Sequence, residues 1–186
     1  MRKLIVFNSV SLDGYFTDRK GDMSWAHRQD KEWNDFVAEN ASGEGELVFG
    51  RVTYEMMMSY WPTSQARKDA PAVAGKMNDA PKIVFSRKMK KATWKNTRLI
   101  GGDLAAETRK LKAERGPPMV LMGSGTIVSQ LTRTRLIDEY QLVVNPIVLG
   151  DGKTLFEGAE EKMGLKLVKT RAFGNGNVLL CYEPVK

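Results

Sequence analysis

The stretch Met119-Val120-Leu121-Met122-Gly123-Ser124-Gly125-Thr126 decides the fold class of this chain. Four apolar residues precede two glycines that flank a serine, and Ile127 and Leu131 then follow four positions apart, on one face of a helix. This order predicts a buried strand over 119–122 that turns at the glycines into a helix over 125–132. Glycines let the backbone approach a ligand, and the first N–H groups of a helix attract anions. The stretch indicates a phosphate site, and a tight turn that requires small residues is an equally good interpretation.

Short apolar runs rich in Val, Ile and Leu alternate with longer segments of helical period along the rest of the chain, which predicts an α/β fold. Several of these runs lack polar alternation, as strands buried on both faces do, so the central sheet is predicted to be mainly parallel. The last two runs, 165–173 and 178–183, flank Gly174-Asn175-Gly176-Asn177 and predict an antiparallel hairpin. The other predicted strands are 4–10, 47–49, 82–85 and 140–144, and the predicted helices are 31–40, 52–60, 71–79, 103–115 and 125–132.

Length and composition predict one globular domain over residues 1–186. With 42% hydrophobic and 27% charged residues, the chain carries enough apolar material for one sizeable core. Because Cys181 and His27 are each the single residue of their type, an internal disulfide, a thiolate zinc cluster and a histidine metal cluster are excluded. We therefore expect no metal site and a reducing, cytoplasmic location. No apolar run approaches the roughly 18 residues of a membrane span, so no membrane association is expected.

The charge balance favours an anionic partner. Lys and Arg number 29 against 22 Asp and Glu, a net charge of +7, which suits a phosphate-bearing ligand or nucleic acid equally. The positive charges are scattered and form no recognised nucleic-acid-binding module, so we expect no nucleic-acid partner.

Two further predicted strands end in groups that bind phosphate. The strand over 47–49 runs into Gly50-Arg51-Val52-Thr53-Tyr54-Glu55, where an arginine fork, a hydroxyl and free N–H groups of the first helical turn can bind one anion. The strand over 82–85 ends at Ser86-Arg87. Each junction alone is compatible with an ordinary cap or a surface charge. Three such strand ends together predict one extended ligand with several phosphates, such as a dinucleotide.

The order and spacing of these motifs resemble the dihydrofolate-reductase-like superfamily, and within it the reductase domain at the C-terminus of the riboflavin-biosynthesis protein RibD and its stand-alone bacterial relatives. The resemblance covers nearly the whole chain. The segments that carry it are Ser11-Leu12-Asp13-Gly14, Gly50 to Glu55, Ser86-Arg87, Gly123-Ser124-Gly125, and Asn145 to Gly152 leading to Leu155-Phe156. It implies a three-layer α/β/α domain that binds NADPH. The cofactor-binding residues that it implies are Gly50, Arg51, Val52, Thr53, Ser86 and Arg87 near the adenosine phosphates, and Gly123, Ser124, Gly125 and Thr126 at the pyrophosphate.

The resemblance also implies a carboxylate that helps a proton reach the substrate. Riboflavin-pathway reductases place it at the aspartate of the Ser-Leu-Asp-Gly segment, here Asp13. Dihydrofolate reductases place it five residues after a tryptophan, and here Trp25 is followed at that distance by Asp30. Each has a structural alternative, a turn residue for Asp13 and a helix N-cap for Asp30.

The substrate is expected to contact polar residues of the first predicted strand and its end, and two aromatic residues. The residues expected to contact the substrate are Asn8, Ser11, Trp25 and Tyr54. Aromatic residues on amphipathic elements are more often part of the core, which is the alternative for Trp25 and Tyr54.

The sequence therefore predicts an NADPH-dependent oxidoreductase, similar to dihydrofolate reductase and aminouracil reductase, that transfers a hydride to a small pterin-like or aminopyrimidine-like heterocycle. A homodimer is implied by the resemblance. The family usually carries a glutamate directly before the glycines, where this chain has Met122. This departure motivates the alternative function, a catalytically idle relative that binds a nucleotide as a sensor or scaffold.

Overall fold

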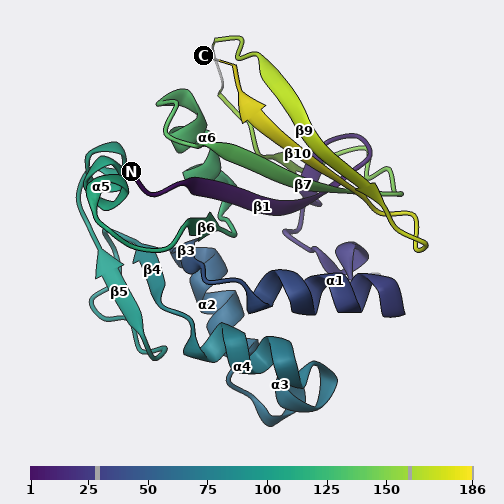
Figure 1. Cartoon of the computed structure of the whole chain (residues 1–186), viewed down its shortest axis with the longest axis horizontal. Coiled ribbons are helices and arrows are strands. Elements are labelled where there is room, and N and C mark those ends of the chain that lie inside the picture. Colours follow the sequence, from purple (N-terminus) through teal and green to yellow (C-terminus); the bar gives the residue numbers. More distant parts are fainter. Residues whose placement is uncertain (28–29, 159–160, 186) are drawn as a thin grey trace.

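An eight-stranded sheet forms the centre of the computed structural model, which describes residues 1–27, 30–158 and 161–185 (Figure 1). Its strands are β1 (Leu4–Ser11), β3 (Glu46–Gly50), β4 (Lys82–Phe85), β5 (Thr97–Ile100), β6 (Met119–Leu121), β7 (Glu139–Asn145), β9 (Leu165–Ala172) and β10 (Val178–Pro184). They lie in the order β5-β4-β3-β6-β1-β7-β10-β9. The strands from β5 to β7 are parallel, whereas β10 pairs antiparallel with β7 and β9. The predicted mostly parallel sheet with an antiparallel C-terminal hairpin is confirmed.

Three strands were absent from the sequence prediction. β5 is the edge strand beside β4, and its Arg98 is exposed, so its sequence is not a continuous apolar run. The other two, β2 (Tyr15–Thr17) and β8 (Lys153–Thr154), form a small antiparallel sheet of their own. Strands this short are stabilised by their tertiary surroundings and leave no periodic signal.

The five predicted helices are present, with ends that differ by at most two residues. They are α1 (Lys31–Ser42), α2 (Arg51–Tyr60), α4 (Pro71–Asp79), α5 (Leu104–Ala113) and α6 (Gly125–Arg133). The short helices η1 (Ser24–Ala26) and α3 (Ser64–Asp69) were not predicted. Within the described ranges, none of the helices combines the length and apolarity that crossing a bilayer requires.

The helices form two layers around the sheet. Ile83 and Val84 are neighbours on β4 and both are fully buried, but they belong to clusters on opposite faces. Ile83 packs in the cluster that contains Leu111 of α5 and Leu131 of α6. Val84 packs in the cluster that contains Met77 of α4, together with residues of α1 and α2. The predicted three-layer α/β/α arrangement is therefore confirmed (Figure 1).

The C-terminal hairpin forms one end of the sheet (Figure 1). β9 is the edge strand, and seven of its eight residues are exposed. Its exposed apolar side chains include Leu165, Leu167 and Val168, whereas Leu179 and Cys181 of the neighbouring β10 are buried. β9 therefore carries exposed apolar side chains at this edge of the sheet, whereas β10 is covered by α1.

Candidate functional site

The three predicted phosphate-binding junctions meet at one edge of the sheet. β4, β3, β6 and β1 are parallel neighbours in that order, so their carboxyl ends lie side by side. These ends lead into Ser86-Arg87, Gly50-Arg51, Met122-Gly123-Ser124 and Leu12-Asp13, respectively. The strand order, which the sequence did not reveal, places the sequence-predicted groups at one edge of the sheet, the edge at which open α/β sheets commonly bind ligands.

The junction after β3 packs directly against the junction after β6. The Gly50 N–H donates to the Gly123 carbonyl oxygen over 2.9 Å. A Cβ atom on Gly50 would lie 2.5 Å from Ser124 Oγ and 3.0 Å from Ile127 Cγ1, so the Ser124 side chain would have to shift to make room for it. Because the φ angle of Gly50 is −80°, any residue can adopt its backbone conformation. Close packing, and not backbone conformation, is the reason for glycine here.

The helices that begin at these two junctions lack side-chain caps. Gly50 and Ser124 are the N-cap residues of α2 and α6; Gly50 has no side chain, and the Ser124 hydroxyl accepts no hydrogen bond from the start of α6. Asp30 and Asp103, in contrast, accept hydrogen bonds from Trp33 N and Ala106 N at the starts of α1 and α5. Two positively polarised helix starts therefore lie next to each other without a protein carboxylate as cap, which is an arrangement suited to an anion.

Asn8, Thr53 and Gly123 come together beside this pair of helix starts. A Cβ atom on Gly123 would lie 3.1 Å from Thr53 Oγ1 and 3.7 Å from Asn8 Oδ1, and the φ angle of Gly123 is +113°, which favours glycine. Asn8 is only 7% exposed, and its Nδ2 has no hydrogen-bond partner among the residues that the structure describes. A buried donor without a partner costs about 1–3 kcal/mol, so this amide is a strong candidate to bind a ligand.

The two predicted arginines lie at the exposed rim of the site. Arg51 Nη1 forms an ion pair with Glu55 Oε2 over 2.7 Å, one helical turn later. Arg87 is exposed, and the preceding Ser86 Oγ accepts hydrogen bonds from Lys88 N and Met89 N, so this hydroxyl also shapes the turn. A phosphate at this edge would compete with Glu55 for the Arg51 guanidinium.

The remaining predicted cofactor-binding residues line the first turns of the two helices. Val52 of α2 is 61% exposed and Thr126 of α6 is exposed, so both present their N-terminal turns to solvent. Gly125 is buried against Phe16 of β2, because a Cβ atom there would lie 2.4 Å from Phe16 Cε1. Phe16 is a contact residue of this junction that sequence reasoning missed, and a single aromatic residue in a three-residue strand gives no signal for it.

Asp13 ties the end of β1 to the segment that follows β7. Its carboxylate accepts hydrogen bonds from Ser11 Oγ over 2.6 Å, Gly150 N over 2.7 Å and Leu149 N over 3.1 Å. The Ser11 hydroxyl and these backbone N–H groups hold the pKa of the Asp13 carboxyl below its usual value. A carboxylate held ionised in this way is an acceptor that positions the loop, and it is a poor proton donor at neutral pH.

The structure also describes the second predicted carboxylate and its tryptophan. Asp30 is the N-cap of α1, with 2.6 Å between Oδ1 and Trp33 N, which confirms the structural alternative for this residue without testing a second role. Trp25 is partly exposed on η1, and its Nε1 donates to the Asp22 carbonyl oxygen over 3.2 Å. η1 packs against β1, so Trp25 lies near the strand that carries Asn8 and Ser11.

Tyr54 is a correction to the predicted substrate contacts. Its side chain is 1% exposed, and its ring packs with Phe49 and Trp94 in the cluster on the α2 and α4 face. Its hydroxyl oxygen accepts a hydrogen bond from Trp94 N over 2.8 Å. The tyrosine is therefore a satisfied core residue, as the alternative stated. Met122, at the position of the family's glutamate, packs against the same cluster.

Asn145 and Asn177, two buried polar residues next to the predicted Ser11, were not among the predicted site residues. Ser11 pairs with Asn145 across β1 and β7, and Asn177 directly precedes Val178, which pairs with Val144, so Asn177 lies at the next position opposite Asn145. Asn145 and Asn177 are fully buried, yet within the described ranges Asn145 Oδ1 and both polar side-chain atoms of Asn177 have no hydrogen-bond partner. Asn177 carried no signal because asparagine in a glycine-rich turn is ordinary.

Comparisons with known proteins identify the family of this chain. The model of the RibD C-terminal domain family matches residues 2–179. The uncharacterized protein YyaP from Bacillus subtilis (strain 168) is 27% identical over 183 residues, which is 98% of this chain and 95% of YyaP.

Two solved structures extend the comparison to the fold. A protein from Shewanella sp. PV-4 that is provisionally assigned to riboflavin biosynthesis has a TM-score of 0.74 at 26% identity, with 99% of both chains covered. Dihydrofolate reductase from Enterococcus faecalis, solved with NADP(H), has a TM-score of 0.66 at 13% identity, with 99% of this chain and 97% of the enzyme covered. At that identity the second likeness concerns the fold alone.

Proposed function

Because the chain belongs to the RibD C-terminal domain family, we propose that it is an NADPH-dependent reductase of a small pterin-like or aminopyrimidine-like heterocycle. The observation that carries the proposal is the meeting of two uncapped helix starts at Gly50 and Ser124, beside the unpartnered Nδ2 of Asn8. These groups are hydrogen-bond donors or carry partial positive charge, and they suit the phosphates of a dinucleotide. The dihydrofolate reductase fold neighbour was solved with the same kind of cofactor, which supports this choice.

NADPH, when bound, supplies the hydride. In the proposal, the first turns of α2 and α6 bind the pyrophosphate, with Thr53 and Gly123 between them. Arg51 and Arg87 bind the phosphate of the adenosine end, for which arginine has the matching donor geometry. The protein's contribution is to hold the cofactor in the orientation that hydride transfer requires.

The proton that accompanies the hydride needs a group that can hold it near the substrate. Asp13 is occupied by three hydrogen bonds and its pKa is lowered, so we assign it the role of holding the 145–152 segment in place. We assign proton delivery to Asp30, since its carboxylate has a second oxygen beyond the one that caps α1. Ser11, Asn8 and Trp25 are proposed to contact the substrate.

Titration with NADPH tests the first half of this proposal. We expect saturable binding, seen as a change in fluorescence and as a rise in the melting temperature. The absence of both signals at about millimolar cofactor would overturn the proposal, because a pocket specific for NADPH binds it far more tightly than this.

Oxidation of NADPH in the presence of pterins and aminopyrimidines tests the second half. Turnover with one of them supports the reductase. Binding without turnover on any of them supports the idle nucleotide-binding relative, which is favoured by Met122 at the position of the family's glutamate.

We further propose that two copies of this domain, which we take to span residues 1–186, associate through β9. This edge strand is exposed on both faces, and the exposed fractions of Leu167 and Val168 are 47% and 46%. An exposed edge strand with apolar side chains is a preferred surface for association. Lys166 and Lys169 on the same strand carry charges that oppose aggregation of many copies through their edge strands.

A further inference from the structure

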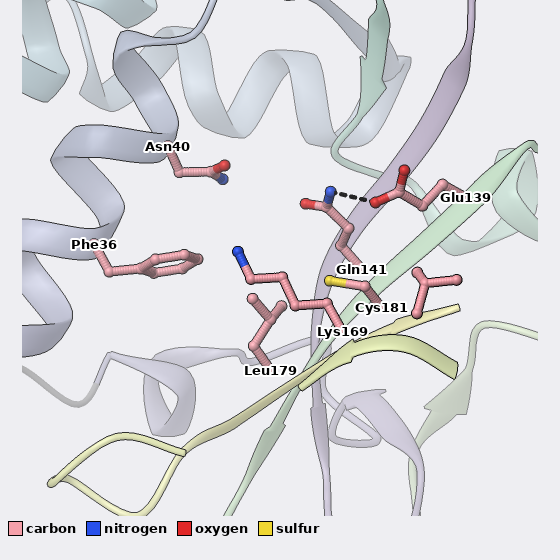
Figure 2. Close-up of a pocket in the computed structure, with 8 residues that line it drawn as sticks. Phe36, Asn40, Glu139, Gln141, Lys169, Leu179 and Cys181 are labelled. Atoms are coloured by element: carbon pink, nitrogen blue, oxygen red, sulfur yellow. Dashed lines mark hydrogen bonds between the residues drawn. The ribbon is translucent and has the colours of Figure 1, made fainter. Parts of the chain in front are cut away.

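A cavity of about 310 Å³ lies on the α1 face of the sheet, between α1 and strands β7, β9 and β10 (Figure 2). It opens at the amino-terminal half of β7, at Glu139 and Gln141, whereas the candidate reductase site lies at the carboxyl ends of the parallel strands. Gln141 lies four positions before Asn145 on β7, which is about 13 Å along a strand. The cavity therefore lies apart from the reductase site, and its lining residues Val168 and Lys169 belong to β9, the strand proposed above for association.

The floor and one wall of this cavity are apolar and rigid. Leu179 and Cys181 of β10 are each 3% exposed and form the floor. Phe36 of α1 forms the wall, and its ring is held by Trp33 at 5.5 Å and Phe173 at 5.0 Å between ring centroids. Burial raises the pKa of the Cys181 thiol, so this floor stays uncharged at neutral pH. Such a surface favours a flat apolar body.

One polar group in the cavity has its orientation fixed. Gln141 Nε2 donates to Glu139 Oε1 over 2.7 Å, and Figure 2 shows the Gln141 amide oxygen on the opposite side, turned toward the cavity. Glu139 also lines the cavity, and its Oε2 lies 4.0 Å from the Lys3 ammonium, which lies 3.2 Å from Glu183 Oε1. The cavity therefore presents a fixed acceptor, Gln141 Oε1, to a ligand.

Two cations of β9 on the α1 face differ in their partners. Arg171 forms an ion pair with Glu32 over 3.2 Å and lies 4.6 Å from the centroid of the Phe173 ring. Lys169, which pairs with Cys181 in the strand register, points its ammonium into the cavity between Phe36 and Gln141 (Figure 2). Within the described part of the chain, no carboxylate lies within ion-pair distance of Lys169. An unpaired ammonium above an apolar floor attracts an anionic group.

We propose that this cavity binds a small aromatic carboxylate that carries an amino or hydroxyl group. The carboxylate pairs with Lys169 Nζ, the ring lies on Phe36 and Leu179, and the amino or hydroxyl hydrogen is donated to Gln141 Oε1. The volume suits one ring with its substituents, at the lower end of the range for ligand pockets.

Titration of the full chain with 2-aminobenzoate, followed by the fluorescence of this probe, tests the proposal. We expect saturable binding that is unchanged in the presence of NADPH. Lys169→Met is expected to weaken it at least about tenfold, because it removes one charge-assisted contact. Lys166→Met, on the same strand and outside the cavity, is the matched control and is expected to bind like the native protein.

A second variant tests the acceptor. Gln141→Leu is expected to bring the affinity for 2-aminobenzoate down to that for benzoate, which lacks the amino donor. The proposal is overturned if no saturation is reached by about 10 mM probe, if Lys169→Met and the native protein bind equally, or if NADPH displaces the probe. None of these outcomes depends on turnover, so they are independent of the reductase assay.

Discussion

At the residue scale, position 50 requires glycine because Ser124 packs against it. We expect Gly50→Ala to destabilise the protein by about 1–3 kcal/mol and to weaken NADPH binding, because a Cβ atom would overlap Ser124 Oγ and force the two junctions apart. Urea unfolding and NADPH titration measure the two effects. Gly75→Ala is the matched control, since a Cβ atom at this exposed helical position meets nothing within 4 Å. That change is expected to stabilise the helix slightly, and equal stability of the two variants would contradict the packing argument.

Arg51 tests the phosphate site with little effect on the fold. We expect Arg51→Ala to raise the Kd for NADPH by about tenfold to a hundredfold, since a charge-assisted hydrogen bond contributes roughly 1.5–3 kcal/mol. The ion pair with Glu55 is exposed, so the melting temperature should change little.

Glu55→Gln provides the control for Arg51. It frees the guanidinium from its carboxylate and is expected to leave NADPH binding equal or tighter. If Arg51→Ala binds NADPH as tightly as the native protein, Arg51 does not contact the cofactor.

Asp30 allows its structural and chemical roles to be separated. Asparagine caps helices about as well as aspartate, so Asp30→Asn is expected to keep the stability of the native protein and to lose most of its turnover. Asp30→Ser, another good cap that cannot deliver a proton from a carboxyl group, should behave in the same way. If Asp30→Asn turns over as fast as the native protein, Asp30 does not deliver the proton and acts only as the helix cap.

At the scale of the element, Lys82 joins α4, β4 and the segment before β5. It is 1% exposed, and its Nζ donates to the carbonyl oxygens of Ala80 over 2.7 Å, Asn78 over 2.9 Å and Lys95 over 3.3 Å. These acceptors include carbonyl groups at the C-terminal end of α4, which the helix itself leaves unsatisfied. Lys82→Met is expected to cost about 1–3 kcal/mol of unfolding free energy at pH 7.

The contribution of Lys82 depends on pH in a defined direction. Burial lowers the pKa of Lys82 to about 8, from an ordinary value of 10.5. Between these two pH values the unfolded state binds more protons than the native state, so this group's contribution to the unfolding free energy rises with pH. The stability difference between the native protein and Lys82→Met should therefore be larger at about pH 9.5 than at pH 7. Lys76→Met, at an exposed position on α4, serves as control, and a gap that narrows with pH would contradict this assignment.

At the scale of the whole molecule, the proposed dimer forms through β9. We expect the native protein to elute as a dimer, and Leu167→Glu to elute as a monomer, because a charge on the exposed edge strand disfavours pairing with a second copy. Light scattering coupled to size-exclusion chromatography measures both masses. Met56→Glu, at an exposed apolar position on α2, is expected to remain a dimer. A monomeric native protein at about 100 µM would contradict the proposal, since a stable dimer is largely assembled there.

The element types were predictable because their causes lie within a few residues. The apolar runs of β1 and β4, the Asp103 cap of α5 and the glycine turn after β6 all act locally, and the structure confirms each of them. β5 and β2 were missed because an edge position or a very short length leaves no such local signal. The strand order also lay outside the sequence pattern, because pairing between β1 and β6 joins residues more than 100 positions apart.

The sequence by itself determined the class of this protein: an α/β domain of the RibD C-terminal type, with glycines and arginines at three strand ends. Only the tertiary structure decided that Gly50 packs on Ser124, that Tyr54 is a core residue, and that Lys169 faces a cavity. The physical reason is the range of the forces. Turn geometry and helix capping are set by neighbouring residues, whereas the free energy of burying a whole sheet selects which distant side chains meet.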